Sequence, residues 1–218
     1  MDQWNKIYKK EGANYSYYHI LKPHQEMSRI VRFFKKQGVK RVLDMGCGAG
    51  KDLVFLAKNG FEVFGIDIAP EGLKFIKAQL KKFKLKSNFK VGNVFDRLPF
   101  QSNFFDAVIS VQVLQHGKVD KIKKAIKEIE RVLRPGGFVF ITLCGRLSKG
   151  KVRYCLVKTA KKIAPHTYVP QIGNEKGLVH FIYNKNIIKE HYNNFKIVSF
   201  CRDDKDYYCF LAQSNKKV

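Results

Sequence analysis

Hydrophobic residues in this sequence form short continuous runs that alternate with segments whose apolar positions recur every three or four residues. The short runs are typical of buried strands, and they occupy Arg41–Met45, Phe61–Asp67, Phe89–Val91, Phe105–Val111 and Phe138–Leu143. The helical period fills Glu26–Lys36, the segment from Leu53 to a stop at Gly60, Pro70–Lys82, and Val119–Leu133, which Pro135-Gly136-Gly137 ends. Alternation of this kind predicts a parallel sheet with helices on both faces.

The end of the chain departs from this alternation. Asn184–Tyr192 has the period of a helix, while Phe195–Arg202 and Asp206–Gln213 have the composition of two strands joined by a polar turn. A terminal hairpin adds one antiparallel strand to a parallel sheet. The whole pattern predicts an α/β, doubly wound, mostly parallel seven-stranded sheet with one antiparallel strand. We expect a single domain over residues 1–218, with 184–218 as its final helix and hairpin.

Two further segments flank the predicted core. In residues 1–36, Trp4 and Tyr8 lie four positions apart, on one face of a helix. With Tyr18 they are interpreted as an aromatic lid over a ligand, the alternative being plain packing of an N-terminal helix. Residues 146–183 are expected to form an insertion that covers the substrate. Within it Val152–Ile163 is predicted as a basic amphipathic helix, either a clamp on an anionic acceptor or a solvated cap.

The charge of the chain is strongly positive, since 42 Lys and Arg against 18 Asp and Glu give a net charge of +24. Such a field attracts RNA and other anions, which makes nucleic acid one candidate partner. However, only 9 of the basic residues are Arg, the type suited to bidentate phosphate recognition, and the lysines run along the whole chain. Solvated helix faces are therefore the preferred interpretation of the charge.

The five cysteines have no metal-ligand spacing and are expected to be reduced, mostly buried thiols of a cytoplasmic protein. No apolar run approaches the roughly 20 residues that span a bilayer, so membrane insertion is not expected. The first ten residues lack the apolar segment of a signal peptide. No metal site is predicted, and the oligomeric state is left open.

The sharpest local signal is a glycine loop, Gly46-Cys47-Gly48-Ala49-Gly50, between a predicted strand and a predicted helix. Glycines let the backbone approach a ligand closely, and the free N–H groups at a helix N-terminus favour an anionic or polar group. Asp67 ends the next strand, where a carboxylate can accept both hydroxyls of a ribose. Its alternative role is an N-cap ahead of Pro70. Nicotinamide enzymes use a similar loop, so the loop alone leaves the ligand open.

Four blocks in order resemble one family, the class I S-adenosylmethionine-dependent methyltransferases, in particular the small type 11 group. The blocks are Val42–Gly50, Val63–Ala69, Val91–Phe100 with Phe105–His116, and Glu128–Thr142. A nicotinamide oxidoreductase accounts for the first two blocks and neither of the others. The resemblance implies a Rossmann-like methyltransferase fold with residues 41–143 as its cofactor-binding core. It also implies S-adenosylmethionine as cofactor and S-adenosylhomocysteine as product.

The resemblance assigns cofactor roles to matching positions. It places the methionine portion near Asp44 and the glycine loop, the ribose on Asp67, and the adenine against Ile68, Asn93 and Val94. Many relatives have Asp at the position of Asn93, and Asp96 is the alternative if the loop is shifted. The predicted cofactor residues are Trp4, Tyr8, Tyr18, Asp44, Gly46, Cys47, Gly48, Asp67, Ile68, Asn93, Val94, Val111 and Gln112.

The methyl acceptor is the feature of the protein that the sequence determines least. Direct displacement from a sulfonium needs orientation and exclusion of water, and a base only if the acceptor must lose a proton, so no catalytic residue is assigned. The candidate substrate-site residues are Gln112, His116, His166, Tyr168, His180 and Tyr183. A small-molecule acceptor is the leading hypothesis. The alternatives are a methyltransferase acting on RNA or protein, and a cofactor-binding protein without catalysis.

Overall fold

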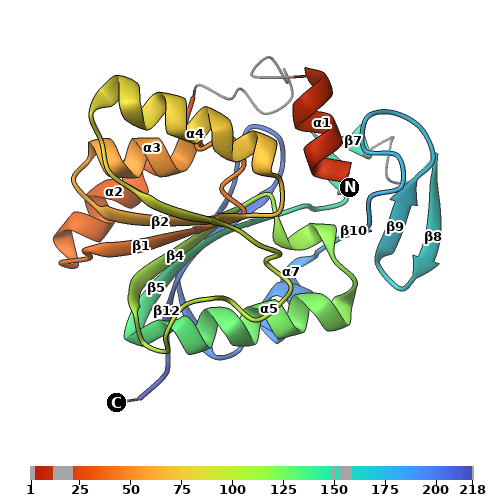
Figure 1. The fold of residues 1–218 in the computed structure, drawn as a ribbon. Coiled ribbons are helices and arrows are strands. Elements are labelled where there is room, and N and C mark those ends of the chain that lie inside the picture. Colours follow the sequence, from red (N-terminus) through yellow and green to blue (C-terminus); the bar gives the residue numbers. More distant parts are fainter. Residues whose placement is uncertain (1–2, 12–21, 149–150, 153–158, 218) are drawn as a thin grey trace.

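A seven-stranded sheet runs through the middle of the computed structural model, which describes residues 3–11, 22–148, 151–152 and 159–217 (Figure 1). The strands lie in the order β11-β12-β5-β4-β1-β2-β3. Strand β12 pairs antiparallel with both of its neighbours, and the pairs among β5, β4, β1, β2 and β3 are parallel. The predicted fold class, with its one antiparallel strand, is confirmed. The strand bounds are Arg41–Met45 (β1), Glu62–Asp67 (β2), Asn88–Val91 (β3), Phe105–Val111 (β4), Leu133–Leu143 (β5), Phe195–Arg202 (β11) and Tyr208–Ser214 (β12).

Helices cover both faces of this sheet (Figure 1). One face carries α2 (Met27–Lys36), α3 (Lys51–Lys58) and α4 (Pro70–Phe83), and the other carries α5 (Val119–Val132) and α7 (Lys185–His191). The N-terminal helix α1 (Gln3–Glu11) packs against α4. A single turn of 3₁₀ helix, η2 (Leu114–His116), follows β4.

The alternation of side chains along the strands explains the two layers of core. Successive residues of a strand point to opposite faces of a sheet. Accordingly, Val42 belongs to the core beneath α2, α3 and α4, whereas its neighbour Leu43 belongs to the core beneath α5 and α7. Both side chains are fully buried. A strand that is apolar at every position therefore has to lie between two layers of helices.

Strand β5 begins earlier than the sequence pattern predicts. The predicted helix over Val119–Leu133 ends at Val132, and β5 starts at Leu133 rather than at Phe138. Phe105 pairs with Leu133 and Ala107 pairs with Phe138, so the register shifts between them and the Pro-Gly-Gly segment bulges out. A bulge accommodates a proline, which has no N–H to give to a ladder, inside a strand.

The insertion over 146–183 is built from strands where the sequence suggested a helix. It contains β6 (Leu147–Ser148) paired with β7 (Lys151–Val152), and an antiparallel sheet of β8 (Ala160–Ala164), β9 (Thr167–Pro170) and β10 (His180–Phe181). The helix predicted over Val152–Ile163 is therefore wrong at both of its described ends, and residues 153–158 between them lie outside the described part. Cross-strand pairing outweighed a local helical period here.

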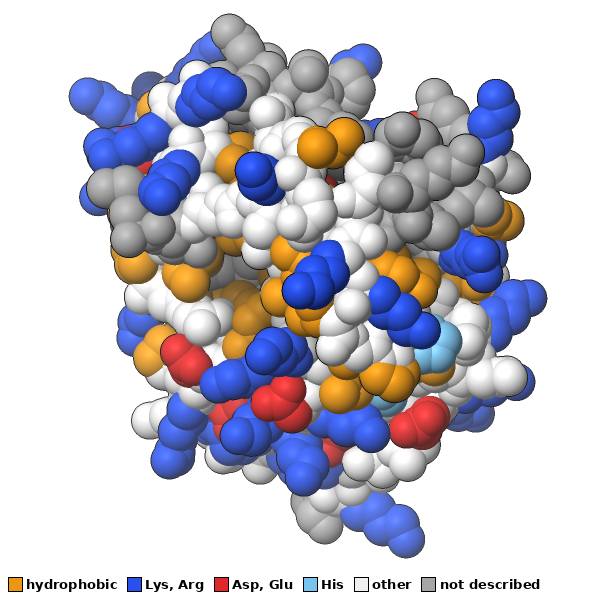
Figure 2. Space-filling model, turned by 90° about the vertical axis from the view of Figure 1, so that its right-hand side faces the viewer, with side chains coloured by type: hydrophobic (Ala, Val, Ile, Leu, Met, Phe, Trp, Pro, Cys, Tyr) orange, Lys and Arg blue, Asp and Glu red, His pale blue; other side chains and the backbone are white. Residues whose placement is uncertain are grey.

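Basic side chains are spread widely over the surface. On the face that carries the β8–β9 hairpin, Lys and Arg are scattered among polar and apolar side chains rather than gathered in one patch (Figure 2). Three of the cysteines, Cys47, Cys144 and Cys209, are buried free thiols, and Cys201 is half-buried. Within the described residues, no helix combines the length and apolar character needed to cross a membrane.

Candidate active site

A cleft with a volume of about 260 Å³ lies where β1, β2 and β4 end at the same edge of the sheet. It collects residues from the glycine loop, from the ends of these strands and from α1. Its lining includes the predicted cofactor residues Trp4, Tyr8, Asp44, Gly46, Cys47, Gly48, Asp67, Ile68, Asn93, Val94, Val111 and Gln112. Tyr18 lies outside the described residues. Asp96, the alternative to Asn93, does not line the cleft.

The glycine loop takes a shape that side chains would prevent. Gly46, Gly48 and Gly50 have φ values of 84°, 51° and 84°, in the region that glycine adopts readily. A Cβ on Gly46 would collide with the side chain of Val113, and a Cβ on Gly48 would collide with the Tyr8 hydroxyl. The loop therefore holds its backbone close to both the segment after β4 and helix α1.

Asp67 combines a structural and a ligand-facing position. Its Oδ2 accepts a hydrogen bond from the Gly48 N–H, and its Oδ1 accepts one from the Ala69 N–H, both at 2.8 Å. The residue that caps α4 is Ala69, so Asp67 is not the N-cap. A carboxylate has about four acceptor sites, so accepting these two bonds is compatible with contacting a ligand in the cleft.

Three carboxylates make one end of the cleft acidic. We define this acidic end as Asp44, Asp52 and Asp67, all buried and all lining the cleft. Burial, followed by the charges of Asp52 and Asp67, raises the pKa of Asp44 well above its usual value, although Lys51 opposes the shift. Such a cluster is electrostatically unfavourable by itself and is relieved by a bound cation.

Gln112 also lines the cleft, directly after β4. Its φ is 60°, a left-handed conformation that a residue other than glycine rarely adopts. Its N–H donates to Thr142 Oγ1 at 2.8 Å, which fixes the backbone there. The buried side-chain Oε1 has no hydrogen-bond partner among the described residues. An orphaned acceptor in strained backbone beside a cleft indicates a ligand that donates a hydrogen bond.

The far end of the cleft is formed by aromatic and imidazole rings. We define the histidine end as Trp4, His116, His180 and Glu175. The ring of His116 lines the cleft and makes edge contacts with Trp4, at 4.9 Å between centroids, and with His180, at 4.6 Å. His180 is buried behind it, 3.0 Å from the Glu175 carboxylate. Burial and the charge of His180 lower the pKa of His116 to about 3.

The remaining predicted substrate residues do not line this cleft. His166 is exposed at the turn of the β8–β9 hairpin, with a φ of 56°. Tyr168 is half-buried on β9, pairing with His180. Tyr183 is buried in the core beneath α7, where burial raises the pKa of its hydroxyl. These three residues support the insertion and its junction with the sheet.

Sequence reasoning missed several lining residues, namely Ala49, Lys51, Asp52, Phe95, Val113 and Leu178. Lys51 and Asp52 directly follow the glycine loop in the first turn of α3, so extending the loop by two positions would have found them. Leu178 carries no such signal, because only the folding of the insertion brings it to the cleft.

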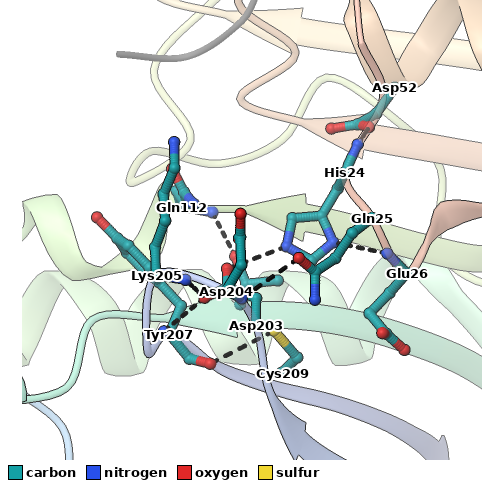
Figure 3. A network of polar contacts seen from close by, with 11 residues as sticks. His24, Gln25, Glu26, Asp52, Gln112, Asp203, Asp204, Lys205, Tyr207 and Cys209 are labelled. Carbon is teal, nitrogen blue, oxygen red and sulfur yellow. Dashed lines mark hydrogen bonds and ion pairs between the residues drawn. The ribbon is translucent and has the colours of Figure 1, made fainter. Parts of the chain in front are cut away.

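A buried network connects the acidic end to the C-terminal hairpin (Figure 3). The His24 N–H donates to Asp52 Oδ1 at 2.6 Å, and the His24 Nε2 lies 3.2 Å from Asp203 Oδ2. His24, Asp203 and Cys209 bring atoms that can ligate metals within 4.8 Å of one another. However, His24 Nδ1 accepts the Glu26 N–H at 3.3 Å, so Nε2 carries the proton and donates it to Asp203. His24 and Asp203 therefore form a hydrogen-bonded pair.

The class of protein follows from the fold and the cleft together. Doubly wound α/β proteins bind ligands in the crevice outside the carboxyl ends of their strands, and this cleft lies there. Residues 43–141 match the family model described as a methyltransferase domain. This match to the type 11 methyltransferase model covers a little under half of the chain and agrees with the resemblance carried by the four blocks.

Individual relatives agree with this family. Over 106 residues the chain is 34% identical to a ubiquinone biosynthesis O-methyltransferase of Xanthomonas oryzae pv. oryzae, covering 49% of this chain and 44% of that protein. It is 29% identical to the mouse EEF1A lysine methyltransferase 2, covering 66% of this chain and 64% of that one. The chain therefore spans less than two thirds of either relative. A solved S-adenosylmethionine-dependent methyltransferase of Methanosarcina mazei superposes with a TM-score of 0.70 at 22% identity, covering 82% of this chain and 94% of that one.

Proposed function

We propose that this chain binds S-adenosylmethionine in the cleft and transfers its methyl group to a small-molecule acceptor. The observation that supports this most is the convergence of Gly48, Asp67 and Gln112 on one cleft. Each is needed by a different part of the cofactor. A nicotinamide dinucleotide carries an anionic pyrophosphate that the acidic end would repel, so it fits these residues less well.

The residues around the cleft fit the cofactor in chemical terms. In this proposal Asp67 accepts hydrogen bonds from the ribose hydroxyls, and Asn93 offers its amide oxygen to the adenine amino group. The carboxylate of Asp44 and the orphaned Oε1 of Gln112 face the ammonium of the methionine portion. Ile68 and Val94 pack on the adenine. The pKa of Asp44 is raised in the ligand-free protein, and a cation in the cleft favours its ionised form.

Methyl transfer depends on the positioning of the two reactants more than on the movement of a proton. The bound cofactor supplies a methyl group on a sulfonium, whose displacement leaves a neutral thioether. Trp4 and Tyr8 project from α1 to the cleft and exclude water from it. Alignment of reactants in this way supplies of the order of 7–11 kcal/mol.

A small-molecule acceptor is favoured by the dimensions of the cleft. Trp4, Phe95, Val113 and Leu178 give it an apolar lining, and the insertion partly covers it. The relative named for ubiquinone biosynthesis is an O-methyltransferase, which is consistent with this acceptor class.

The cofactor is tested by thermal unfolding with S-adenosylhomocysteine, S-adenosylmethionine or NADH. A ligand present at 100 times its dissociation constant stabilises the fold by about 2.7 kcal/mol, or roughly 5–11 °C at this chain length. We expect this shift with the two adenosyl compounds and none with NADH. A shift with NADH alone contradicts the proposal.

The second candidate is a methyltransferase that acts on RNA or protein, which the net charge of +24 and the similarity to a lysine methyltransferase favour. RNA binding with an affinity that falls steeply between 50 and 200 mM salt, on the order of a thousandfold, would support the RNA acceptor. Cofactor binding without turnover on either a small-molecule panel or macromolecules would instead indicate a non-catalytic binding protein.

A further inference from the structure

Asp52 is a carboxylate of the cleft to which the family resemblance assigns no role. It lies in the first turn of α3, is 4% exposed and lines the cleft with Asp44. After burial, the charge of Asp52 contributes most to raising the pKa of Asp44, and a backbone hydrogen bond from the next residue, Leu53, opposes that shift. The carboxylates of Asp44 and Asp52 therefore lie close together at the acidic end.

One oxygen of the Asp52 carboxylate has a backbone partner. The His24 N–H donates to Oδ1 at 2.6 Å, in a buried contact between residues 28 positions apart. Within the described part of the chain no hydrogen bond to Oδ2 is formed. An ionised carboxylate has about four acceptor sites. Asp52 therefore keeps acceptor capacity for a ligand in the cleft.

His24 is itself held from two sides (Figure 3). Its carbonyl oxygen accepts the Met27 N–H at 2.8 Å, in the turn that opens α2. Its Nε2 donates to Asp203 Oδ2 at 3.2 Å, and its ring contacts that of Phe140, at 5.7 Å between centroids. Both the backbone and the ring of His24 are therefore fixed, and with them the N–H group that meets Asp52.

Asp203 anchors these contacts in the turn between β11 and β12. Its Oδ1 accepts the N–H groups of Lys205, at 2.9 Å, and of Tyr207, at 2.8 Å. Burial alone would raise the pKa of Asp203, but the hydrogen bonds from His24 and from these two N–H groups outweigh it and lower the pKa. Three segments that are far apart along the chain thus form one network that ends at the cleft.

Resting on the function proposed above, we propose that Asp52 binds the ammonium of the cofactor together with Asp44, and that His24, fixed by Asp203, is its positioning residue. A cation between two buried carboxylates relieves their mutual repulsion. The His24 N–H holds the Asp52 side chain in one orientation, so ligand binding does not have to order it. Neither His24 nor Asp203 lines the cleft, and both act through Asp52.

The test separates the ammonium from the rest of the cofactor. S-adenosylhomocysteine carries the ammonium, whereas 5′-methylthioadenosine has the same adenosine and thioether without the amino-acid portion. Calorimetry gives the ratio of their dissociation constants. In Asp52→Asn we expect S-adenosylhomocysteine to bind about tenfold more weakly and 5′-methylthioadenosine to bind as before. Asp106→Asn is the matched control and should keep the wild-type ratio, because Asp106 also accepts backbone N–H groups but lies away from the cleft.

The positioning role is tested with two substitutions of His24. His24→Phe keeps a ring against Phe140 and loses the bond to Asp203, so the affinity for S-adenosylhomocysteine alone should fall about threefold. His24→Gln keeps an N–H donor and should recover most of this loss. If His24→Phe does not fold, Asp203→Asn replaces it. Its amide oxygen still accepts the Lys205 and Tyr207 N–H groups, but its amide nitrogen cannot accept from His24, so the same selective loss is expected.

The outcomes distinguish this proposal from the proposed function. An equal loss for both ligands in Asp52→Asn, or no loss, overturns the ammonium site, because a merely structural Asp52 would affect the whole cleft. An equal loss for both ligands in His24→Phe, or no recovery in His24→Gln, overturns the positioning role. Failure of the wild-type protein to bind S-adenosylhomocysteine contradicts the proposed function instead.

Discussion

The two ends of the cleft are built from different kinds of segment. The acidic end comes from the ends of β1 and β2, which are adjacent in a parallel sheet, and from the first turn of α3. The histidine end comes from α1, η2 and the insertion, which have no fixed spacing along the chain. A rigid sheet edge holds the first set, whereas contacts between separate elements hold the second.

This difference suggests different roles for the two ends. Residues on neighbouring strand ends keep their geometry whatever the loops do, so a common cofactor fits there. An insertion can change its strands without disturbing the sheet, so it is the natural place for acceptor specificity. We therefore expect changes at the acidic end to affect the cofactor first and changes at the histidine end to spare it.

The largest effect is expected from Asp67→Asn. Loss of the charged acceptor for two ribose hydroxyls should weaken S-adenosylhomocysteine binding by about 10- to 150-fold, from about 1.5–3 kcal/mol for hydrogen bonds to a charged group. Calorimetry checks this. Asp106→Asn is the matched control, because Asp106 also accepts two backbone N–H groups but lies away from the cleft. It should lower stability without changing affinity, and equal affinity losses in both variants would contradict the assignment.

The next effect is expected from Gly48→Ala. The added Cβ meets the Tyr8 hydroxyl at a φ of 51°, so both the loop and α1 have to move. We expect about a tenfold weaker affinity for S-adenosylhomocysteine, measured as above, on top of about 1 kcal/mol of backbone strain. Gly38→Ala has a φ of 65° and open space around its Cβ, so it should show the strain alone. If Gly48→Ala binds normally, the loop does not contact the cofactor closely.

A smaller effect, a gain in the stability of the ligand-free protein, is expected for Asp44→Asn. Burial and the neighbouring carboxylates raise the pKa of Asp44 in the folded protein above its unfolded value of about 3.9. Folding therefore disfavours the ionised form, and wild-type stability falls as pH rises from the unfolded pKa through the folded one. The ligand-free variant should be more stable than wild type by about 1 kcal/mol at pH 7, with no such gain near pH 4. Urea unfolding at both pH values checks this, and a less stable variant at pH 7 would count against it.

The smallest loss of affinity is expected from Asn5→Ala, which loosens the helix that carries Trp4 and Tyr8. Asn5 Oδ1 accepts the Glu71 N–H at 2.9 Å and so fixes α1 on α4. Because α1 carries Trp4 and Tyr8, its loosening should weaken S-adenosylhomocysteine binding by a factor of about three, from roughly 0.6 kcal/mol, as measured by calorimetry. An unchanged affinity would show that the position of α1 does not matter for the cofactor.

Much of the regular core could be predicted from local pattern. The bounds of β1 and β4 agree with the predicted runs, because most of their positions are apolar and are buried on both faces of the sheet. The start of β5 at Leu133 and the strands of the insertion could not be predicted in this way. Their strands depend on partners far along the chain, and the pairing of β8 with β9 outweighed the helical spacing of its residues.

The residues of the candidate site also divide into those that the local sequence predicts and those that only folding brings together. The glycine loop and Asp67 could be recognised from the sequence. A backbone that bends sharply needs glycine, and the end of a strand can be recognised without knowing its distant partners. Sequence reasoning found His116 and His180 as separate candidates but not their contact with each other, and it missed Glu175 and Leu178 altogether.

The sequence by itself determined the order of the core strands and helices along the chain, and the position of the glycine loop. These depend on hydrophobic period and on the conformational freedom of glycine, which are properties of a few consecutive residues. Only the tertiary structure decided which side chains meet at the histidine end. Its contacts join Trp4 of α1, His116 of η2 and His180 of the insertion, which are far apart along the chain and are brought together only by folding.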